Sequence, residues 1–138
     1  PVDILEEDRE AQHIYAEHIG KRDDYLYNRV RNGVMRFGMF AVGIRRAGTF
    51  PSVEAANKLL NATLDANQDI VDAVVSGTKS EAFLQSDFTA PTGREAYRNN
   101  DRAEPVLRDT YGVAVRIAHD KTLKRGFRIK TVFPNNRD

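Results

Sequence analysis

Cysteine is absent from this 138-residue chain. The chain therefore cannot form disulfides, bind zinc through thiolates or use a thiol nucleophile. The lack of disulfides favours a protein that works in a reducing cytosol or that unfolds to cross a membrane. Long apolar runs are also absent, which argues against stable membrane insertion, and no signal-peptide pattern is found.

Histidine is scarce, with three residues in the chain. His13 and His18 are five positions apart, about 140° around a helix at ~100° per residue, so one helix cannot direct both at one metal ion. There is no HExxH motif, P-loop or GxSxG motif. Asp65, Asp69 and Asp72 share one face of a predicted helix, which is more typical of a solvated face than of a metal site. The sequence therefore predicts no metal and no cofactor.

The charges are unevenly distributed, although the formal net charge is only +1. Residues 1–17 contain one arginine against six acids, and residues 51–93 contain two basic residues against six acids. By contrast, residues 18–50 contain seven basic residues against two acids, and residues 94–138 contain eleven against six. Either the two basic segments meet in the fold and form a surface for a polyanion, or their side chains are simply solvated.

Hydrophobic periodicity predicts helices first and strands last. The predicted helices cover 8–19, 23–36 and 52–76. Ser52 caps the last one, and the pattern also allows this helix to divide into two after Asn67. The predicted strands cover 81–89, 111–119 and 127–133, and the last two form a hairpin. Residues 37–44 fit a strand or a buried loop, 45–48 a turn, and 89–106 a long polar loop. This order favours an α+β fold with an antiparallel sheet.

The domain organisation predicted from the sequence is simple. Residues 1–8 form an acidic arm or linker, and residues 9–138 form one domain. Because the chain begins with Pro1, we expect it to be part of a longer protein.

In the last strand, alternation predicts that Phe127, Ile129, Thr131 and Phe133 share one side and that Arg128 and Lys130 share the other.

Two side chains near the N-terminus are candidates for acid–base chemistry. His18 closes the first predicted helix just before Gly20, where the simplest interpretation is a charge partner for the helix dipole. Arg29 lies beside the apolar stripe of the second predicted helix, where a guanidinium pairs with an internal carboxylate or with a ligand. With Lys21 nearby, this set suits a phosphodiester. RNA carries its own nucleophile, the 2′-hydroxyl, so its cleavage needs neither metal nor cysteine.

Two motifs together resemble a known family. They are Glu17-His18-Ile19-Gly20-Lys21, followed by Leu26 and Arg29, and the final run GFRIKTVFP at 126–134. This order resembles the bacterial ribonuclease A-like toxin domain, which forms the C-terminal tips of contact-dependent growth inhibition proteins and related polymorphic toxins. The resemblance extends from about His13 to Asn135. It implies a ribonuclease A-like fold without disulfides, with helices packed around a kinked antiparallel sheet.

The resemblance also implies a function. It implies metal-independent cleavage of RNA, with tRNA among the candidates, to a 2′,3′-cyclic phosphate in the cytoplasm of a target bacterial cell. A larger protein, secreted or displayed at the cell surface, would deliver the domain. A cognate immunity protein would neutralise it, and we expect this partner to be acidic because it must cover basic segments.

The resemblance assigns roles to individual residues. It makes His18 the catalytic base, Arg29 the group that stabilises the pentacovalent phosphate, and Thr131 the group that positions it. The candidate substrate-binding residues are Lys21, His119, Lys130 and Phe133.

Phe133 departs from the family pattern, which often has a tyrosine at this position. A phenyl ring has no proton to donate, although it can stack on a base. The general acid therefore stays open among His119, Tyr111, Tyr97 and a water molecule.

Two other functions remain open. A non-catalytic RNA- or partner-binding module predicts binding with a steep salt dependence and no turnover. A toxin with different chemistry, such as a transferase acting on a nucleotide cofactor, is less favoured because no pocket for one is recognisable.

Overall fold

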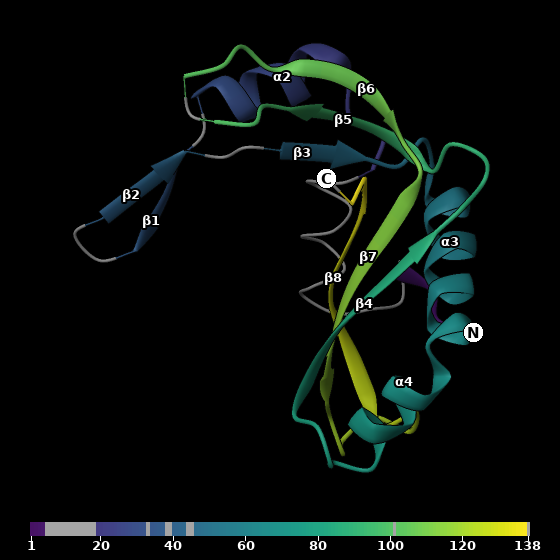
Figure 1. Cartoon of the computed structure of the whole chain (residues 1–138). Coiled ribbons are helices and arrows are strands. Elements are labelled where there is room, and N and C mark those ends of the chain that lie inside the picture. The colour runs from purple at the N-terminus through teal and green to yellow at the C-terminus, as the bar shows by residue number, and fades with distance from the viewer. Residues whose placement is uncertain (5–18, 33, 38–39, 44–45, 101, 138) are drawn as a thin grey trace.

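A computed structural model describes residues 1–4, 19–32, 34–37, 40–43, 46–100 and 102–137 (Figure 1). In these ranges the helices are α2 (Asp23–Asn32), α3 (Val53–Ala66) and α4 (Gln68–Val75). The strands are β1 (Val34–Phe37), β2 (Phe40–Gly43), β3 (Arg46–Thr49), β4 (Glu81–Asp87), β5 (Gly93–Tyr97), β6 (Val106–Thr110), β7 (Gly112–His119) and β8 (Phe127–Asn135). They form a β1-β2 hairpin and two antiparallel sheets, ordered β3-β5-β6 and β4-β7-β8. The predicted α+β class is confirmed.

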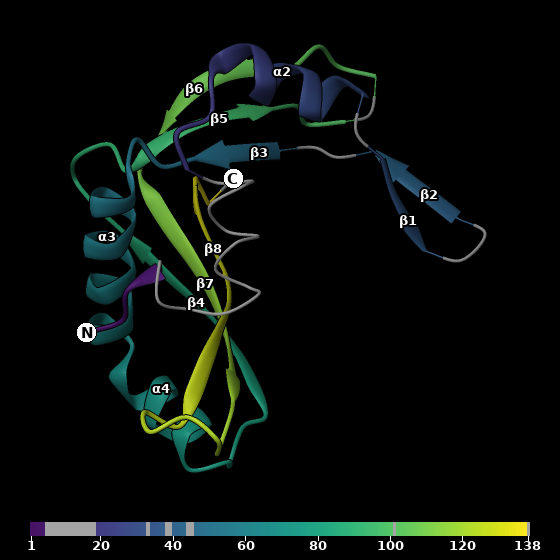
Figure 2. The same ribbon diagram turned by 180° about the vertical axis from the view of Figure 1, so that it is seen from behind.

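The two three-stranded sheets are set at a steep angle and meet where β6 leads into β7 (Figures 1 and 2). Helix α2 lies on the outer side of β3-β5-β6, and helices α3 and α4 cover one face of β4-β7-β8. The β1-β2 hairpin extends away from both sheets in both views. The corner between the sheets brings β3 against the end of β8.

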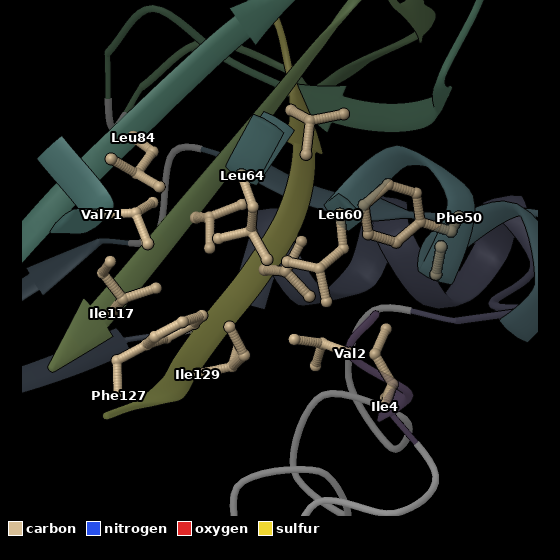
Figure 3. Close-up of a cluster of buried hydrophobic side chains, with 14 of the residues drawn as sticks. Val2, Ile4, Phe50, Leu60, Leu64, Val71, Leu84, Ile117, Phe127 and Ile129 are labelled. Carbon is tan, nitrogen blue, oxygen red and sulfur yellow. The ribbon is translucent and has the colours of Figure 1, made fainter. Parts of the chain in front are cut away.

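The main core lies between β4-β7-β8 and helices α3 and α4. Its fully buried side chains include Leu60, Val74, Leu84, Val113, Val115, Ile117, Ile129 and Val132, and Figure 3 shows several of them gathered in one cluster. Burying one such side chain contributes about 1.5–3 kcal/mol relative to leaving it exposed. This core fixes the position of β7 and β8.

The helices that cover this core begin and break as their sequence predicts. The Ala55 backbone N–H donates to the Ser52 hydroxyl (3.1 Å), which confirms the predicted N-cap of α3. The Asn67 backbone N–H bonds to the Leu64 carbonyl and ends α3, and α4 starts at Gln68. The predicted break is therefore confirmed at Asn67, where one residue turns the helix along the sheet.

The N-terminal residues contribute to the same core. Val2 and Ile4 are buried in it, and their backbone N–H groups donate to the side-chain oxygens of Asn61 and Asn57, each at 2.8 Å. The described start of the predicted acidic arm thus packs on α3.

A second, smaller core attaches α2 to the other sheet. Leu26 and Val30 of α2 are fully buried against Ala96, Ala47 and Leu107 of β5, β3 and β6. Because side chains alternate along a strand, Arg46, Glu95 and Arg108, which are adjacent in sequence to these three residues, face away from α2.

Three local predictions were wrong, two of them because the pairing partners β3 and β5 are distant in sequence. The helix predicted over 23–36 ends at Asn32, and β1 follows. The turn predicted at 45–48 is largely β3, and the loop predicted at 89–106 contains β5, which pairs with β3. Residues 37–44 contain β2, so the strand alternative holds for them.

Two glycines that resemble turn signals are close-packing positions within these strands. A Cβ on Gly48 would lie 2.6 Å from the Pro134 carbonyl oxygen, and a Cβ on Gly93 would lie 2.2 Å from the Thr49 carbonyl oxygen. A glycine inside a strand often marks such a close backbone approach.

Strand β8 contains a bulge. Ile129 is opposite Ile117, but Thr131 is opposite Arg116, so Lys130 is the extra residue. A bulge of this kind re-aims the side chains that follow it. It therefore changes which face of the sheet the end of β8 presents.

The predicted alternation of β8 was wrong beyond this bulge. Phe127 and Ile129 are in the core, but the next core residue is Val132, not Thr131. Thr131 and Phe133 lie on the opposite face, because one extra residue reverses the facing of every residue after it. We call the side of β4-β7-β8 that packs on α3 and α4 the core face. The outer face carries Phe83, Gln85, Arg116, Thr131 and Phe133.

Candidate functional site

The chain that follows His18 is attached to the end of β3. His18 itself lies outside the described residues. Ile19, directly after it, forms a parallel bridge with Phe50, and the Gly20 backbone N–H donates to the Phe50 carbonyl at 2.8 Å. Gly20 has φ of 67°, which a residue with a side chain adopts only with strain. The motif that contains His18 is thus connected to the strand that leads into the corner between the sheets.

A cavity of about 230 Å³ lies at this corner. Its lining comes from both sheets, namely Arg46, Ala47 and Gly48 of β3 and Thr131, Phe133 and Pro134 of β8. Two of the predicted site residues, Thr131 and Phe133, therefore lie together with a guanidinium that the sequence did not single out. The bulge makes this possible, because it turns both side chains away from the core.

Arg46 is held in place by a buried carboxylate. Glu95 on β5 is fully buried, and Arg46 Nη1 lies 3.7 Å from its Oε1. Arg108 Nε and Nη2 reach Glu95 Oε2 at 2.9 and 2.8 Å. The ring of Tyr97 lies under both guanidinium groups, 5.0 Å from Arg46 and 4.2 Å from Arg108. Arg46 Nη1 also donates to the Asn136 carbonyl at 2.8 Å, so an ion pair, a hydrogen bond and a cation–π contact together orient Arg46 at the cavity.

This cluster was missed by sequence reasoning. Arg46 was placed in a turn, and Glu95, Tyr97 and Arg108 were placed in or next to a polar loop. The alternation in Arg94–Tyr97 is the only local signal, and it does not reveal that β5 pairs with β3 about 50 residues away.

Arg29 lies in the last turn of α2 and is exposed. Helix α2 packs on the side of β3-β5-β6 that carries Ala47 and Ala96, whereas Arg46 alternates to the other side. Among the described residues, no hydrogen bond, ion pair or cavity joins Arg29 to Thr131.

Lys21 lines a different cavity, of about 420 Å³, which also includes Arg94 and Asp109. Its Nζ lies 4.9 Å from the centre of the Tyr25 ring. Arg94 bridges Asp23 and Asp109 at 3.1 Å each, and the hydrogen bond to Asp23 is the main cause that raises the pKa of Arg94. The charge of this arginine is therefore already compensated within the protein.

The remaining predicted residues lie apart from the corner. His119 Nδ1 is 2.8 Å from the Val74 carbonyl oxygen, at the end of β7 beside α4. Lys130 Nζ donates to Glu81 Oε1 at 2.7 Å, and this bond is the main cause that lowers the pKa of Glu81. Tyr111 is 45% exposed between β6 and β7. Of the three protein candidates for a general acid, Tyr97 adjoins the cavity-lining Arg46.

Within the described ranges, no three His, Asp or Glu side chains are placed to hold a metal ion. Asp65, Asp69 and Asp72 are exposed along α3 and α4, as expected for a solvated helix face. None of the described helices is long and apolar enough to cross a membrane.

Comparison with known proteins adds two observations. The family model described as bacterial CdiA-CT RNAse A domain matches residues 12–134. The fold is similar to that in a crystal structure of a CdiA-CT/CdiI complex from Y. kristensenii 33638, with a TM-score of 0.72 and 23% sequence identity. This match covers 89% of the present chain and 98% of the other. Among curated proteins, no significant sequence match is found.

Proposed function

The chain belongs to the bacterial CdiA-CT RNase A domain family, and from this premise we propose that it is a toxin ribonuclease that cleaves RNA without a metal ion. The observation that carries the proposal is the corner between the sheets. There the segment that follows His18 meets the end of β3, and the cavity next to the start of the same strand is lined by Arg46, Thr131 and Phe133. A guanidinium, a hydroxyl and an aromatic ring in one cavity suit a phosphate and its adjoining base.

The proposed reaction is an internal transphosphorylation. His18 takes the proton from the 2′-hydroxyl while the 2′-oxygen forms a bond to phosphorus. Thr131 donates a hydrogen bond to the phosphate, and Arg46 stabilises the added negative charge. The resemblance gives this second role to Arg29, which lies on α2, on the other side of β3-β5-β6 from Arg46. The bond from phosphorus to the 5′-oxygen then breaks, and a general acid protonates that oxygen. The products are a 2′,3′-cyclic phosphate and a free 5′-hydroxyl.

Tyr97 is our candidate for the general acid. In our proposal it takes the role of the tyrosine that Phe133 replaces, because its ring contacts Arg46, and Arg46 lines the cavity. Phe133 then serves as an apolar wall for a base. Lys21, Lys130 and His119 remain candidates for more distant RNA contacts, since their described positions lie outside this cavity.

We further propose a partner and a place of action. The solved relative is a complex of CdiA-CT with CdiI, which supports a cognate immunity protein for this chain. That protein would be acidic, because the corner contains Arg46 and Arg108. The chain would be the toxin part of a larger delivery protein and would act on RNA, tRNA included, in the cytoplasm of the target cell.

The test is cleavage of total RNA in excess chelator. We expect wild type to cleave and to leave 2′,3′-cyclic ends, whereas His18→Ala and Thr131→Ala each lose about a hundredfold or more in rate. Arg102→Ala, which removes an exposed charge from a turn, is the matched control and retains full activity. Tyr97→Phe, which removes the hydroxyl of the candidate acid, should lower the rate by about a hundredfold.

Each contrary outcome has a clear meaning. Cleavage that His18→Ala leaves unchanged contradicts the assigned base. RNA binding with a steep salt dependence but no turnover contradicts the enzyme and supports a binding module.

A further inference from the structure

The outer face of β4-β7-β8 extends beyond the cavity in one cross-strand row. Phe83 of β4 is opposite Arg116 of β7, and Arg116 is opposite Thr131 of β8. Neighbouring strands are about 4.8 Å apart, so the row spans roughly 10 Å from Thr131 to Phe83. A ring, a guanidinium and a hydroxyl are thus set side by side on the outer face, and Thr131 belongs both to the row and to the cavity.

The exposure of Phe83 needs an explanation. It is 53% exposed, whereas its chain neighbour Leu84 is fully buried on the core face. The described helices that cover this sheet, α3 and α4, lie on the core face. A single exposed apolar residue is ordinary on a protein surface. This ring, however, stands next to a cation and in line with a predicted catalytic residue.

Arg116 is exposed and supplies that cation. Among the described residues, no hydrogen bond or ion pair engages its guanidinium, and its charge acts on Glu81 only through space. Lys130 on the same side differs, because Glu81 binds it directly. Arg116 is therefore positioned to bind a ligand anion without first releasing a described carboxylate.

We propose that the row Phe83–Arg116 is a second RNA subsite, which binds the nucleotide beyond the two that flank the cleaved phosphodiester. Phe83 stacks on its base and Arg116 binds its phosphate, while Thr131 holds the cleaved phosphate in the cavity. Aromatic rings beside basic side chains bind single-stranded nucleic acid in this manner, and stacking does not depend on the identity of the base. The inference rests on the proposed function, since it takes Thr131 as the point where cleavage occurs.

The first experiment compares two substrates. A dinucleotide occupies only the cleavage cavity, and a hexanucleotide also reaches the row. We expect Phe83→Ala and Arg116→Ala each to raise KM for the hexanucleotide roughly fivefold or more, and to cleave the dinucleotide as wild type does. Phe83→Trp keeps the stacking surface and restores the low KM. Val106→Ala and Arg102→Ala are the matched controls, because they remove an exposed apolar side chain and an exposed charge outside the row.

The second experiment measures binding of a 2′-O-methyl hexanucleotide, which cannot be cut. Arg116→Ala should weaken binding and reduce the slope of log affinity against log salt by about 0.7. Wild-type binding without cleavage of ordinary RNA would remove the proposed enzyme but leave the row supported. Binding by both variants that equals binding by the controls overturns the subsite. A loss of activity that is as large on the dinucleotide as on the hexanucleotide also overturns it. Loss of affinity only for an immunity protein also overturns it.

Discussion

The two faces of the β4-β7-β8 sheet use the same three strands for different purposes. On the core face, Leu84, Val115 and Ile117 are fully buried against α3 and α4. On the outer face, Phe83 and Arg116 are exposed, although each is adjacent in sequence to one of those core residues. Side chains that alternate along a strand thus separate the requirements of folding from those of binding.

The difference between the faces shows what the bulge in β8 contributes. Without an extra residue, a strand that buries Ile129 also buries Thr131 and exposes Val132. With Lys130 inserted, Val132 enters the core, and Thr131 becomes available to a ligand. The extra residue Lys130, which has no partner on β7, therefore decides that Thr131 lies on the outer face.

The largest expected effect comes from comparing a substitution on the core face with one at the adjacent residue on the outer face. Ile117→Ala removes a fully buried side chain, and we expect it to lower the free energy of unfolding by about 2–5 kcal/mol in a urea titration. Arg116→Ala changes the preceding residue on the outer face and should stay within about 0.5 kcal/mol of wild type. Similar losses for both would show that the outer face is also part of the packed interior.

Deleting single residues at the bulge should change stability less than Ile117→Ala does, but it should change RNA cleavage strongly. Deletion of Lys130 and deletion of Thr131 each leave a regular ladder that still buries Ile129 and Val132. The two proteins differ in the side chain opposite Arg116, which is threonine in the first and lysine in the second. We expect both to fold, the second somewhat less stably, because two like charges would face each other across the strands.

The activities of these two deletion variants should separate. Deletion of Lys130 keeps a hydroxyl at the cavity and retains RNA cleavage within about tenfold of wild type. Deletion of Thr131 removes the hydroxyl and costs about a hundredfold or more, as loss of a hydrogen-bond donor to a developing oxyanion does. Equal activities would mean that Thr131 does not act on the phosphate. Unfolding of both would mean that β8 is not bulged at Lys130.

The sequence is informative where structure is local. Ser52 and Asn67 mark the start of α3 and its junction with α4, and the β7-β8 hairpin follows from two alternating runs joined by a short turn. The family motif also leads to Thr131 without any coordinates. In each of these places, neighbouring residues carry the whole signal.

The sequence is uninformative where distant strands or an irregular register decide. Arg46 becomes a cavity residue only because β3 pairs with β5, and β5 lies in a stretch whose polarity resembles a loop. The bulge is hidden because Lys130 and Thr131 are both polar, so either one fits the outward position between Ile129 and Val132. Only the packing of Val132 against the core distinguishes the two registers.

The smallest expected effect concerns the ion pair between Glu81 and Lys130. The hydrogen bond from Lys130 lowers the pKa of Glu81 below its ordinary value of 4.5. A carboxyl with a lowered pKa in the folded state stabilises the protein above its unfolded pKa, and loses that contribution as the pH falls through the folded pKa. Wild type should therefore melt slightly above Lys130→Met at pH 7, and the gap should close below about pH 4.

Lys124→Met is the matched control for this ion pair. Lys124 is exposed in the turn between β7 and β8 and has no described carboxylate partner. Its melting temperature relative to wild type should not depend on pH in the same window. Both partners of the Glu81–Lys130 pair are partly solvent-exposed, so the difference at pH 7 should also shrink at high salt. A gap that survives both acid and salt would show that the Lys130 side chain stabilises the bulge by packing and not by charge.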